Sequence, residues 1–156
     1  MTDYRKLLQI LAQNQVLFIL IGGAAAIAHG SARLTEDLDI VYERSLANIK
    51  RMVASLAPYH PYLRGVPPGL PFLWDAETIQ RGLNFMLTTP LGDIDLFGEI
   101  ISGGTYQDLL PHIITLEVFK QECQIINLSR LIEIKRATGR PKDLQAIAEL
   151  ESIRKR

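Results

Sequence analysis

Helix-like and strand-like patterns alternate over the first third of the chain. Apolar residues recur at helical spacing over residues 3–14, which predicts an amphipathic helix. Residues 16–21 form a short β-branched and aromatic run, which is typical of a buried strand. A Gly-Gly pair ends this run. The patterns that follow predict a helix over residues 24–29, a strand over 38–42 and a helix over 46–56.

The pattern changes after residue 56. Five prolines and two glycines between residues 57 and 71 predict a long loop. Two apolar runs, over residues 85–88 and 94–97, flank a Thr-Pro-Leu-Gly segment and predict a β-hairpin. The remaining patterns predict a short helix over 105–110, strands over 113–119 and 123–126, a helix from a Ser129 cap to about residue 138, and a helix over 142–152 after Pro141.

Together these elements predict an α/β or α+β fold, in which helices flank a mixed β-sheet and further helices lie at the C-terminal end. No internal repeat, low-complexity tract or linker divides the sequence. We therefore expect a single domain over residues 1–156.

The composition narrows the classes of function. The chain has 17 basic and 17 acidic residues, so it lacks the basic excess of a dedicated nonspecific DNA binder. Its apolar runs fall short of the roughly 20 residues that a membrane span needs, and its first residues do not form a signal peptide. Cys123 is the only cysteine, and we expect a buried small side chain rather than a catalytic thiol. These features favour a cytoplasmic protein without membrane contact.

The Gly22-Gly23 pair lies where a strand is expected to pass into a helix. Glycine lets the backbone approach a ligand closely, and the free N–H groups at a helix start favour a negative group. The pair therefore suits a triphosphate, but a glycine pair at a turn is also common without any ligand.

Two pairs of aspartates give the stronger chemical signal. Side chains alternate along a strand, so Asp37 and Asp39 point to one face, and Asp93 and Asp95 repeat this pattern on a later strand. Hard divalent cations such as Mg²⁺ prefer carboxylate oxygens. A single strand with two aspartates is also explained without a metal, as an exposed edge of the sheet whose charges aid solubility. Two acidic strands side by side would repel each other unless cations bind between them, so the metal interpretation is favoured.

The spacing of these residues resembles a known family. Gly22-Gly23, then thirteen residues, then Asp37-x-Asp39 with a later strand acid, is similar to the signature of the DNA polymerase β-type nucleotidyltransferase superfamily. Residues 33–40, Arg-Leu-Thr-Glu-Asp-Leu-Asp-Ile, resemble the matching stretch of its small bacterial single-domain members, which include nucleotidyltransferase toxins. Residues 135–144 resemble their C-terminal helix-break-helix segment.

The resemblance implies a set of site residues. Asp37, Asp39 and Asp95 would be catalytic and would bind two ions of Mg²⁺ or Mn²⁺, with Asp93 as the alternative to Asp95 because strand alternation does not separate them. The residues implied to bind the nucleotide are Gly22, Gly23, Arg33 and Lys135.

Several of these residues also have structural interpretations. Arg33 is equally explained as an exposed loop arginine, and Lys135 as a surface lysine paired with Glu133 or Glu151. We expect the remaining candidates to serve packing or turns rather than ligand binding: Tyr62 and Trp74 in the long loop, and Arg140, Lys142 and Asp143 in a salt-bridged turn.

The implied reaction moves a nucleoside monophosphate from an NTP, ATP among them, to a hydroxyl acceptor on a small molecule, a protein or an RNA. The chain leaves little room for an acceptor-binding domain, so we expect a homodimer or a partner chain to supply one. The toxin-like members imply a toxin–antitoxin context with tRNA as one acceptor. The alternative is a nucleotide-binding or interaction module that keeps the fold but has no transferase activity.

Overall fold

The centre of the computed structural model is a seven-stranded mixed β-sheet. The structure describes the backbone of residues 1–156 and the side chains of all of them except Lys142. The strand order is β3-β4-β5-β2-β1-β9-β8. The strands are β1 (Phe18–Ile21), β2 (Asp37–Tyr42), β3 (Tyr62–Leu63), β4 (Asn84–Thr89), β5 (Gly92–Phe97), β8 (Ile113–Val118) and β9 (Gln121–Ile126).

Two of the strand pairs are parallel, β2 with β5 and β1 with β9, and the other neighbours are antiparallel. A second, two-stranded sheet follows β5 and consists of β6 (Glu99–Ile100) and β7 (Gly104–Thr105). The mixed sheet that the sequence predicts is therefore confirmed.

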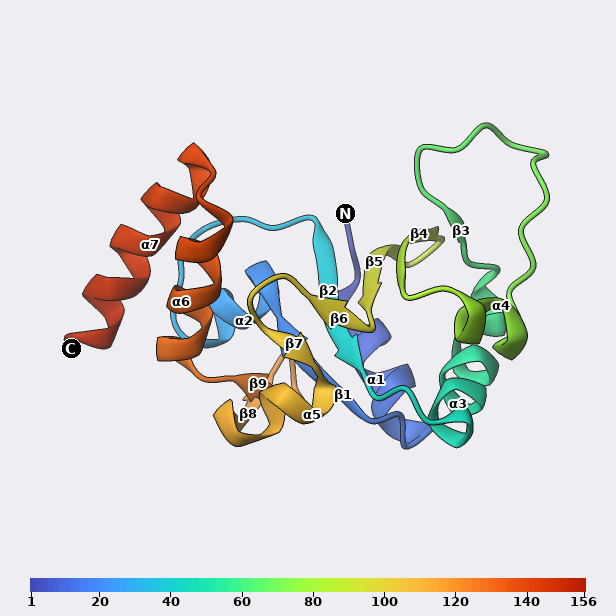
Figure 1. Cartoon of the computed structure of the whole chain (residues 1–156), viewed down its shortest axis with the longest axis horizontal. Helices are drawn as coiled ribbons and strands as arrows, with labels where there is room; N and C mark the ends of the chain where they lie inside the picture. The colour runs from blue at the N-terminus through green and yellow to red at the C-terminus, as the bar shows by residue number, and fades with distance from the viewer.

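Helices flank the sheet, with the C-terminal pair α6 and α7 at one end and α3, α4 and the loop of residues 64–75 at the other (Figure 1). The helices are α1 (Tyr4–Gln13), α2 (Gly22–Ala28), α3 (Leu46–Leu56), α4 (Ala76–Arg81), α5 (Tyr106–Leu109), α6 (Leu128–Thr138) and α7 (Pro141–Arg154), with 3-10 turns η1 (Ala57–Tyr59) and η2 (Leu110–His112). Among the residues that the structure describes, no helix has the length and apolar character of a membrane span.

A buried asparagine joins α3 to the sheet. Asn48 is fully buried, and its amide group accepts a hydrogen bond from the Leu17 N–H at 2.7 Å and donates to the Leu17 and Glu43 carbonyls at 3.0 and 2.8 Å. The backbone at the start of β1 and just after β2 is thus satisfied by one side chain. Cys123 is also buried, as its lone occurrence predicts.

Most expected elements are confirmed, and the differences are local. The helix over 46–56 is α3, and the expected hairpin is β4 and β5. The structure adds β3 within the predicted loop, α4, and the pair β6–β7. The expected Ser129 cap is wrong, because Asn127 caps α6 by accepting a hydrogen bond from the Arg130 N–H at 2.8 Å.

The cap assignment predicts different effects of two alanine substitutions. Asn127→Ala removes the acceptor for a helix N–H and is expected to lower the free energy of unfolding by about 1 kcal/mol. Ser129→Ala lies within the helix and is expected to change it by less than about 0.5 kcal/mol. Urea unfolding of both variants measures the difference. A larger loss for Ser129→Ala would contradict the structure.

Candidate active site

The parallel register of β2 and β5 brings the two acidic pairs together. Asp37 lies opposite Asp93, and Asp39 lies opposite Asp95. One carboxylate oxygen from each of Asp37, Asp39 and Asp95 lies within 4.8 Å of the other two. The structure thus groups Asp95 with the first pair and places Asp93 beside Asp37, a distinction that strand alternation leaves open.

The N-terminal segment fixes the starts of both acidic strands. The Thr2 hydroxyl donates to the Glu36 carbonyl and accepts a hydrogen bond from the Asp93 N–H at 3.1 Å. The Tyr4 hydroxyl donates to the Thr35 carbonyl at 2.5 Å. Residues just before and within the two strands are therefore held to the same short segment, which limits how far the carboxylates can move apart.

The cluster formed by Asp37, Asp39 and Asp95 strongly favours the binding of a proton or a cation. Burial, followed by the nearby charges of Asp95 and Asp37, raises the pKa of Asp39 to about 8. Burial also raises the pKa of Asp95, although Arg64 opposes the shift. Asp39 Oδ1 is buried and has no hydrogen-bond partner among the described side chains and backbone. An all-oxygen donor set with an unsatisfied buried oxygen fits a hard divalent cation.

Arg64 is a site residue that the sequence analysis does not identify. It follows β3, and its guanidinium contacts Asp37 Oδ1 at 3.2 Å and Asp93 Oδ2 at 3.4 Å and also pairs with Asp95. Burial lowers the pKa of Arg64, but the three carboxylates outweigh this effect and raise it. The sequence does contain a signal, since Arg64 is the only charged residue between positions 61 and 74.

The Gly-Gly pair is required by the packing of the acidic strand. Gly22 has a φ of +67°, and a Cβ there would overlap the Asp39 carboxylate. A Cβ on Gly23 would lie 2.5 Å from the Thr35 hydroxyl oxygen. From the sequence, these glycines are explained by close approach to a ligand. In the structure they are the first residues of α2 and also let the start of this helix pass directly beside Asp39.

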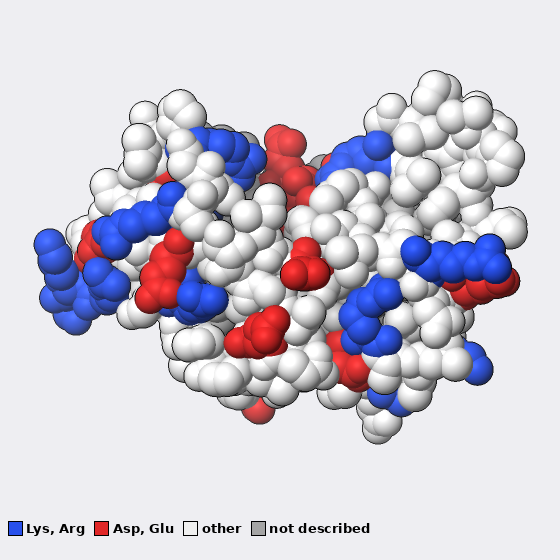
Figure 2. Space-filling view, viewed as in Figure 1, with Lys and Arg blue, Asp and Glu red and all other residues white. Residues whose placement is uncertain are grey.

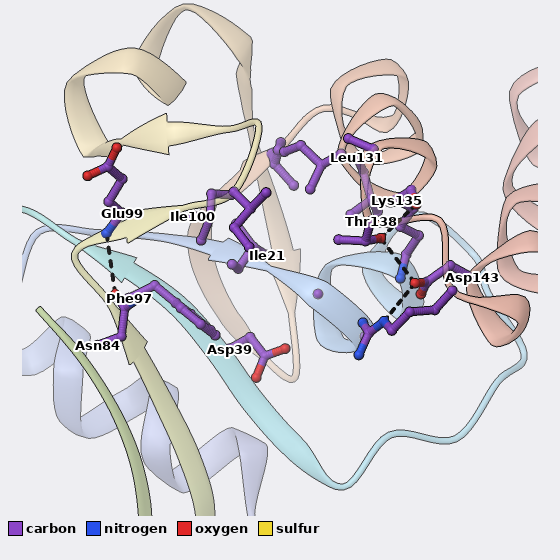
Figure 3. A pocket seen from close by; sticks show the side chains of 17 residues that line it. Ile21, Asp39, Asn84, Phe97, Glu99, Ile100, Leu131, Lys135, Thr138 and Asp143 are labelled. Carbon is purple, nitrogen blue, oxygen red and sulfur yellow. Dashed lines mark hydrogen bonds and ion pairs between the residues drawn. The ribbon is translucent and has the colours of Figure 1, made fainter.

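A cavity of about 730 Å³ adjoins this turn and lies between the sheet and α6 (Figure 3). Gly22, Gly23 and Asp39 line one part of it, and Lys135 and Arg140 line another. The rest of its wall is largely apolar and includes Ile21, Phe97, Ile100, Ile101, Ile126, Leu131 and Ile134. A small ligand with both an anionic and an apolar part fits such a lining.

Lys135 faces this cavity rather than an acidic partner on the helix surface. It is half-buried, and burial lowers its pKa, with Asp143 and Asp39 opposing that shift. Glu133 pairs with Arg130, and Glu151 pairs with Arg136 and Arg154. The alternative interpretation of Lys135 as a partner of Glu133 or Glu151 is therefore wrong.

Arg33 lies at a second, smaller cavity of about 230 Å³. This cavity shares Gly23 and Lys135 with the larger one, so Arg33 is near the glycine turn. Its side chain is 45% exposed and contacts Glu149 at 3.7 Å. The expected turn contains an ion pair of 2.9 Å between Arg140 and Asp143, whereas the side chain of Lys142 lies outside the described residues.

Solved structures of other proteins share this arrangement of elements. The lincosamide antibiotic adenylyltransferase LnuA, in a lincomycin-bound structure, superimposes with a TM-score of 0.65 at 15% identity over 98% of both chains. The fold is that of nucleotidyltransferases. A candidate nucleotidyltransferase from Thermotoga maritima has the same fold, with a TM-score of 0.61 at 12% identity over 100% of this chain and 97% of that one.

A third structure with the nucleotidyltransferase fold is an antigenic nucleotidyltransferase-like protein from Paracoccidioides brasiliensis. It matches with a TM-score of 0.56 at 17% identity over 96% of this chain and 72% of that one. No family model matches the sequence, and no curated protein matches it. At these identities the comparisons show the nucleotidyltransferase fold, and the chemistry has to be argued from the site itself.

The close approach of Gly22 to Asp39 predicts a large effect of a single methyl group. Gly22→Ala is expected to lower the free energy of unfolding by about 3 kcal/mol, because the strain of positive φ adds to the overlap with the carboxylate. Gly69→Ala is the matched control, since Gly69 has a φ of +95° and no atom within 4 Å of the added Cβ. It is expected to lose only about 1 kcal/mol. Equal losses in denaturant unfolding would contradict this packing.

The raised pKa of Asp39 predicts how the stability of the metal-free protein depends on pH. Asp39 stays protonated in the folded state up to about pH 8 but ionises near pH 4 when unfolded. The unfolded state therefore binds fewer protons, and this group destabilises the fold increasingly as the pH rises from 4 to 8. Asp39→Asn removes the effect, so its melting temperature relative to the unsubstituted protein should rise between pH 5 and pH 8 in EDTA. A constant difference would refute the pKa assignment.

Proposed function

We propose that this protein is a metal-dependent nucleotidyltransferase that moves a nucleoside monophosphate from an NTP to a hydroxyl acceptor. The observation that carries the proposal is the convergence of Asp37, Asp39 and Asp95 within 4.8 Å, directly beside the Gly22 turn. Three clustered carboxylates next to a cavity with basic side chains are suited to hold divalent ions and a triphosphate together.

Asp37, Asp39 and Asp95 would bind Mg²⁺ or Mn²⁺, two ions in the fully loaded site. Bound ions of this kind supply Lewis-acid charge that neutralises the triphosphate and the developing negative charge of the reaction. The unsatisfied Asp39 Oδ1 and the raised pKa of Asp39 support the role of this residue as a ligand.

The chain's own residues would position the two reactants. Gly22 and Gly23 carry no side chain between the backbone and the triphosphate, and Lys135 lines the same cavity as a positive partner for phosphate. Arg33 is a second basic side chain near this turn. The apolar wall from Phe97 to Ile134 would receive the nucleoside, and the cavity volume falls within the range of about 300–1,000 Å³ that is usual for small-ligand sites.

In the proposed reaction the acceptor hydroxyl oxygen forms a bond to the α-phosphorus of the NTP. The bond from the α-phosphorus to the bridging oxygen breaks, and pyrophosphate leaves with that electron pair. The hydroxyl proton passes to a carboxylate, and we assign this role to Asp95, because β5 is the acidic strand farthest from Gly22 and lies beside β4.

Finer expectations from the sequence remain predictions. They are ATP binding, a toxin–antitoxin context, a cytoplasmic location, and a homodimer or partner chain. The alternative of a nucleotide-binding module without activity differs in one measurable respect, because it would bind Mg²⁺ and NTP but release no pyrophosphate.

Substitutions of the aspartates test the proposal. Asp39→Asn and Asp95→Asn are each expected to reduce Mg²⁺-dependent pyrophosphate release from labelled NTP by about 10³-fold, since each removes a charged ligand from the carboxylate group. Asp93→Asn is the control on the same sheet face. Asp93 lies outside the group of three, so its substitution should retain activity within about tenfold.

The experiment also requires a binding measurement. Calorimetric titration with Mg²⁺ and ATP should show tight binding that Asp39→Asn abolishes and Asp93→Asn retains. Binding unaffected by Asp39→Asn would remove this residue from the site. Greater sensitivity of activity to Asp93 than to Asp95 would contradict the assignment of the third carboxylate.

A further inference from the structure

The surfaces on the two sides of the cluster of Asp37, Asp39 and Asp95 differ in their charged side chains. On the side of α2 and α6 lie the glycine pair, Lys135, Arg140 and Arg33, of which Arg140 pairs with Asp143 and Arg33 with Glu149. β3, β4 and residues 65–74 carry no charged side chain. Arg64 does lie on this side, since its N–H donates to the Met86 carbonyl at 2.9 Å and its guanidinium pairs with Asp95. In Figure 2 the surface is hollowed between the C-terminal helices and the loop, and the raised end over the loop carries no coloured atoms at its tip.

The uncharged side continues the open face of the sheet. Met86 lies directly opposite Asp95 in the β4–β5 register, and Thr88 lies opposite both Asp93 and Tyr62. Directly paired residues of antiparallel strands share a face, so these side chains lie beside the aspartates. Met86 is 38% exposed. We call this surface the acceptor platform: Tyr62, Met86, Thr88 and the loop of residues 65–74.

The loop that borders the platform is held by specific contacts. The Tyr62 hydroxyl donates to the Leu70 carbonyl at 2.7 Å and lies 3.2 Å from the Pro67 carbonyl oxygen, and its ring packs edge-on against Phe72. The Trp74 indole N–H donates to the Val53 carbonyl at 2.9 Å. The expected packing role of Tyr62 and Trp74 is thus confirmed. Leu70 and Leu73 stay exposed on this loop.

On the basis of the function proposed above, the position of the platform indicates that it binds the acceptor. In an in-line displacement the attacking oxygen approaches the α-phosphorus opposite the leaving pyrophosphate. In the proposed function the phosphates lie next to Gly22, which follows β1, and the carboxylates lie on β2 and β5. The acceptor must therefore approach from the next strands of the sheet, which are β4 and β3.

The charge of the platform disfavours a polyanion. Residues 65–74 contain no acidic or basic side chain. Arg64 is the only basic side chain between positions 61 and 74. Of the arginines near α4, Arg44 donates to backbone carbonyls of that helix and Arg81 pairs with Glu77. A nucleic-acid acceptor needs several basic side chains along its phosphates.

We propose that the acceptor is an uncharged small molecule with an apolar body, which packs on Met86 and the 65–74 loop and presents its hydroxyl group to Asp95. Of the acceptors that the sequence leaves open, this proposal favours a small molecule and disfavours tRNA. The apolar contact supplies the affinity, and the adjacent carboxylates select the hydroxyl group.

Methionine methyl groups provide a direct test, because the chain has three methionines of which Met52 is fully buried and Met86 lies on the platform. The protein is labelled with ¹³C-methyl methionine and loaded with Mg²⁺ and a non-hydrolysable ATP analogue. Octyl glucoside, kept below its micelle concentration, serves as an uncharged hydroxyl probe with an apolar tail. A single-stranded 12-nucleotide RNA serves as the polyanionic probe.

We expect octyl glucoside to shift the Met86 methyl signal saturably while Met52 stays unchanged, and we expect the RNA to leave Met86 unchanged. A Met86 shift with RNA, or no saturable shift with octyl glucoside, would overturn the proposal. Binding of Mg²⁺ and ATP to the labelled protein before loading is measured separately by calorimetry. Loss of that binding would refute the nucleotidyltransferase function, whereas the Met86 signal decides the platform alone.

A matched pair of variants gives the second measurement. Met86→Glu should weaken octyl glucoside binding about tenfold, because it removes an apolar contact and adds a carboxylate that would lose its hydration against the ligand's tail. Leu110→Glu is the control, since Leu110 has the same 38% exposure but lies in η2. The fluorescence of Trp74, the only tryptophan, reports binding in both variants. Equal weakening in the two variants would contradict the platform.

Discussion

The parallel register between β2 and β5 is the constraint on which the rest of the site depends. It places Asp37 opposite Asp93 and Asp39 opposite Asp95, so four carboxylates share one end of a sheet face. Such a cluster is unfavourable unless protons or cations balance it. Two features reduce this repulsion. The guanidinium of Arg64 pairs with the carboxylates, and Asp39 has a pKa of about 8, so it keeps its proton near neutral pH.

The fold also separates the functions of the two flanks. The turn at Gly22 and Gly23 passes so close to the acidic strand that no side chain fits there, and the basic residues of the C-terminal helices face the same cavity. The opposite flank, built from β3, β4 and the proline-rich loop, has little charge. A site with one anionic and one uncharged reactant explains this asymmetry, which a purely structural cluster of acids does not.

The sequence predicts much of this arrangement, because hydrophobic periodicity is local. The period of α3 and the hairpin of β4 and β5 are visible in short windows, and so is the shared face of Asp37 and Asp39. Strand pairing is not local, so alternation alone cannot choose between Asp93 and Asp95. The register makes that choice.

Two other features are not predicted from the sequence. Arg64 reaches the site only because β3 pairs with β4, and β3 has just two residues within a segment whose prolines indicate a loop. Asn127 replaces Ser129 as the cap of α6 because two polar residues lie close to the helix start, and backbone geometry decides between them.

The most direct test of the central claim is the position of bound manganese. Anomalous scattering from crystals grown with Mn²⁺ and a non-hydrolysable ATP analogue would locate each ion. The account predicts Mn²⁺ coordinated by carboxylate oxygens of Asp37, Asp39 and Asp95, with the triphosphate next to Gly22 and Gly23. Manganese bound elsewhere, or a triphosphate on the β4 side of the carboxylates, would contradict it.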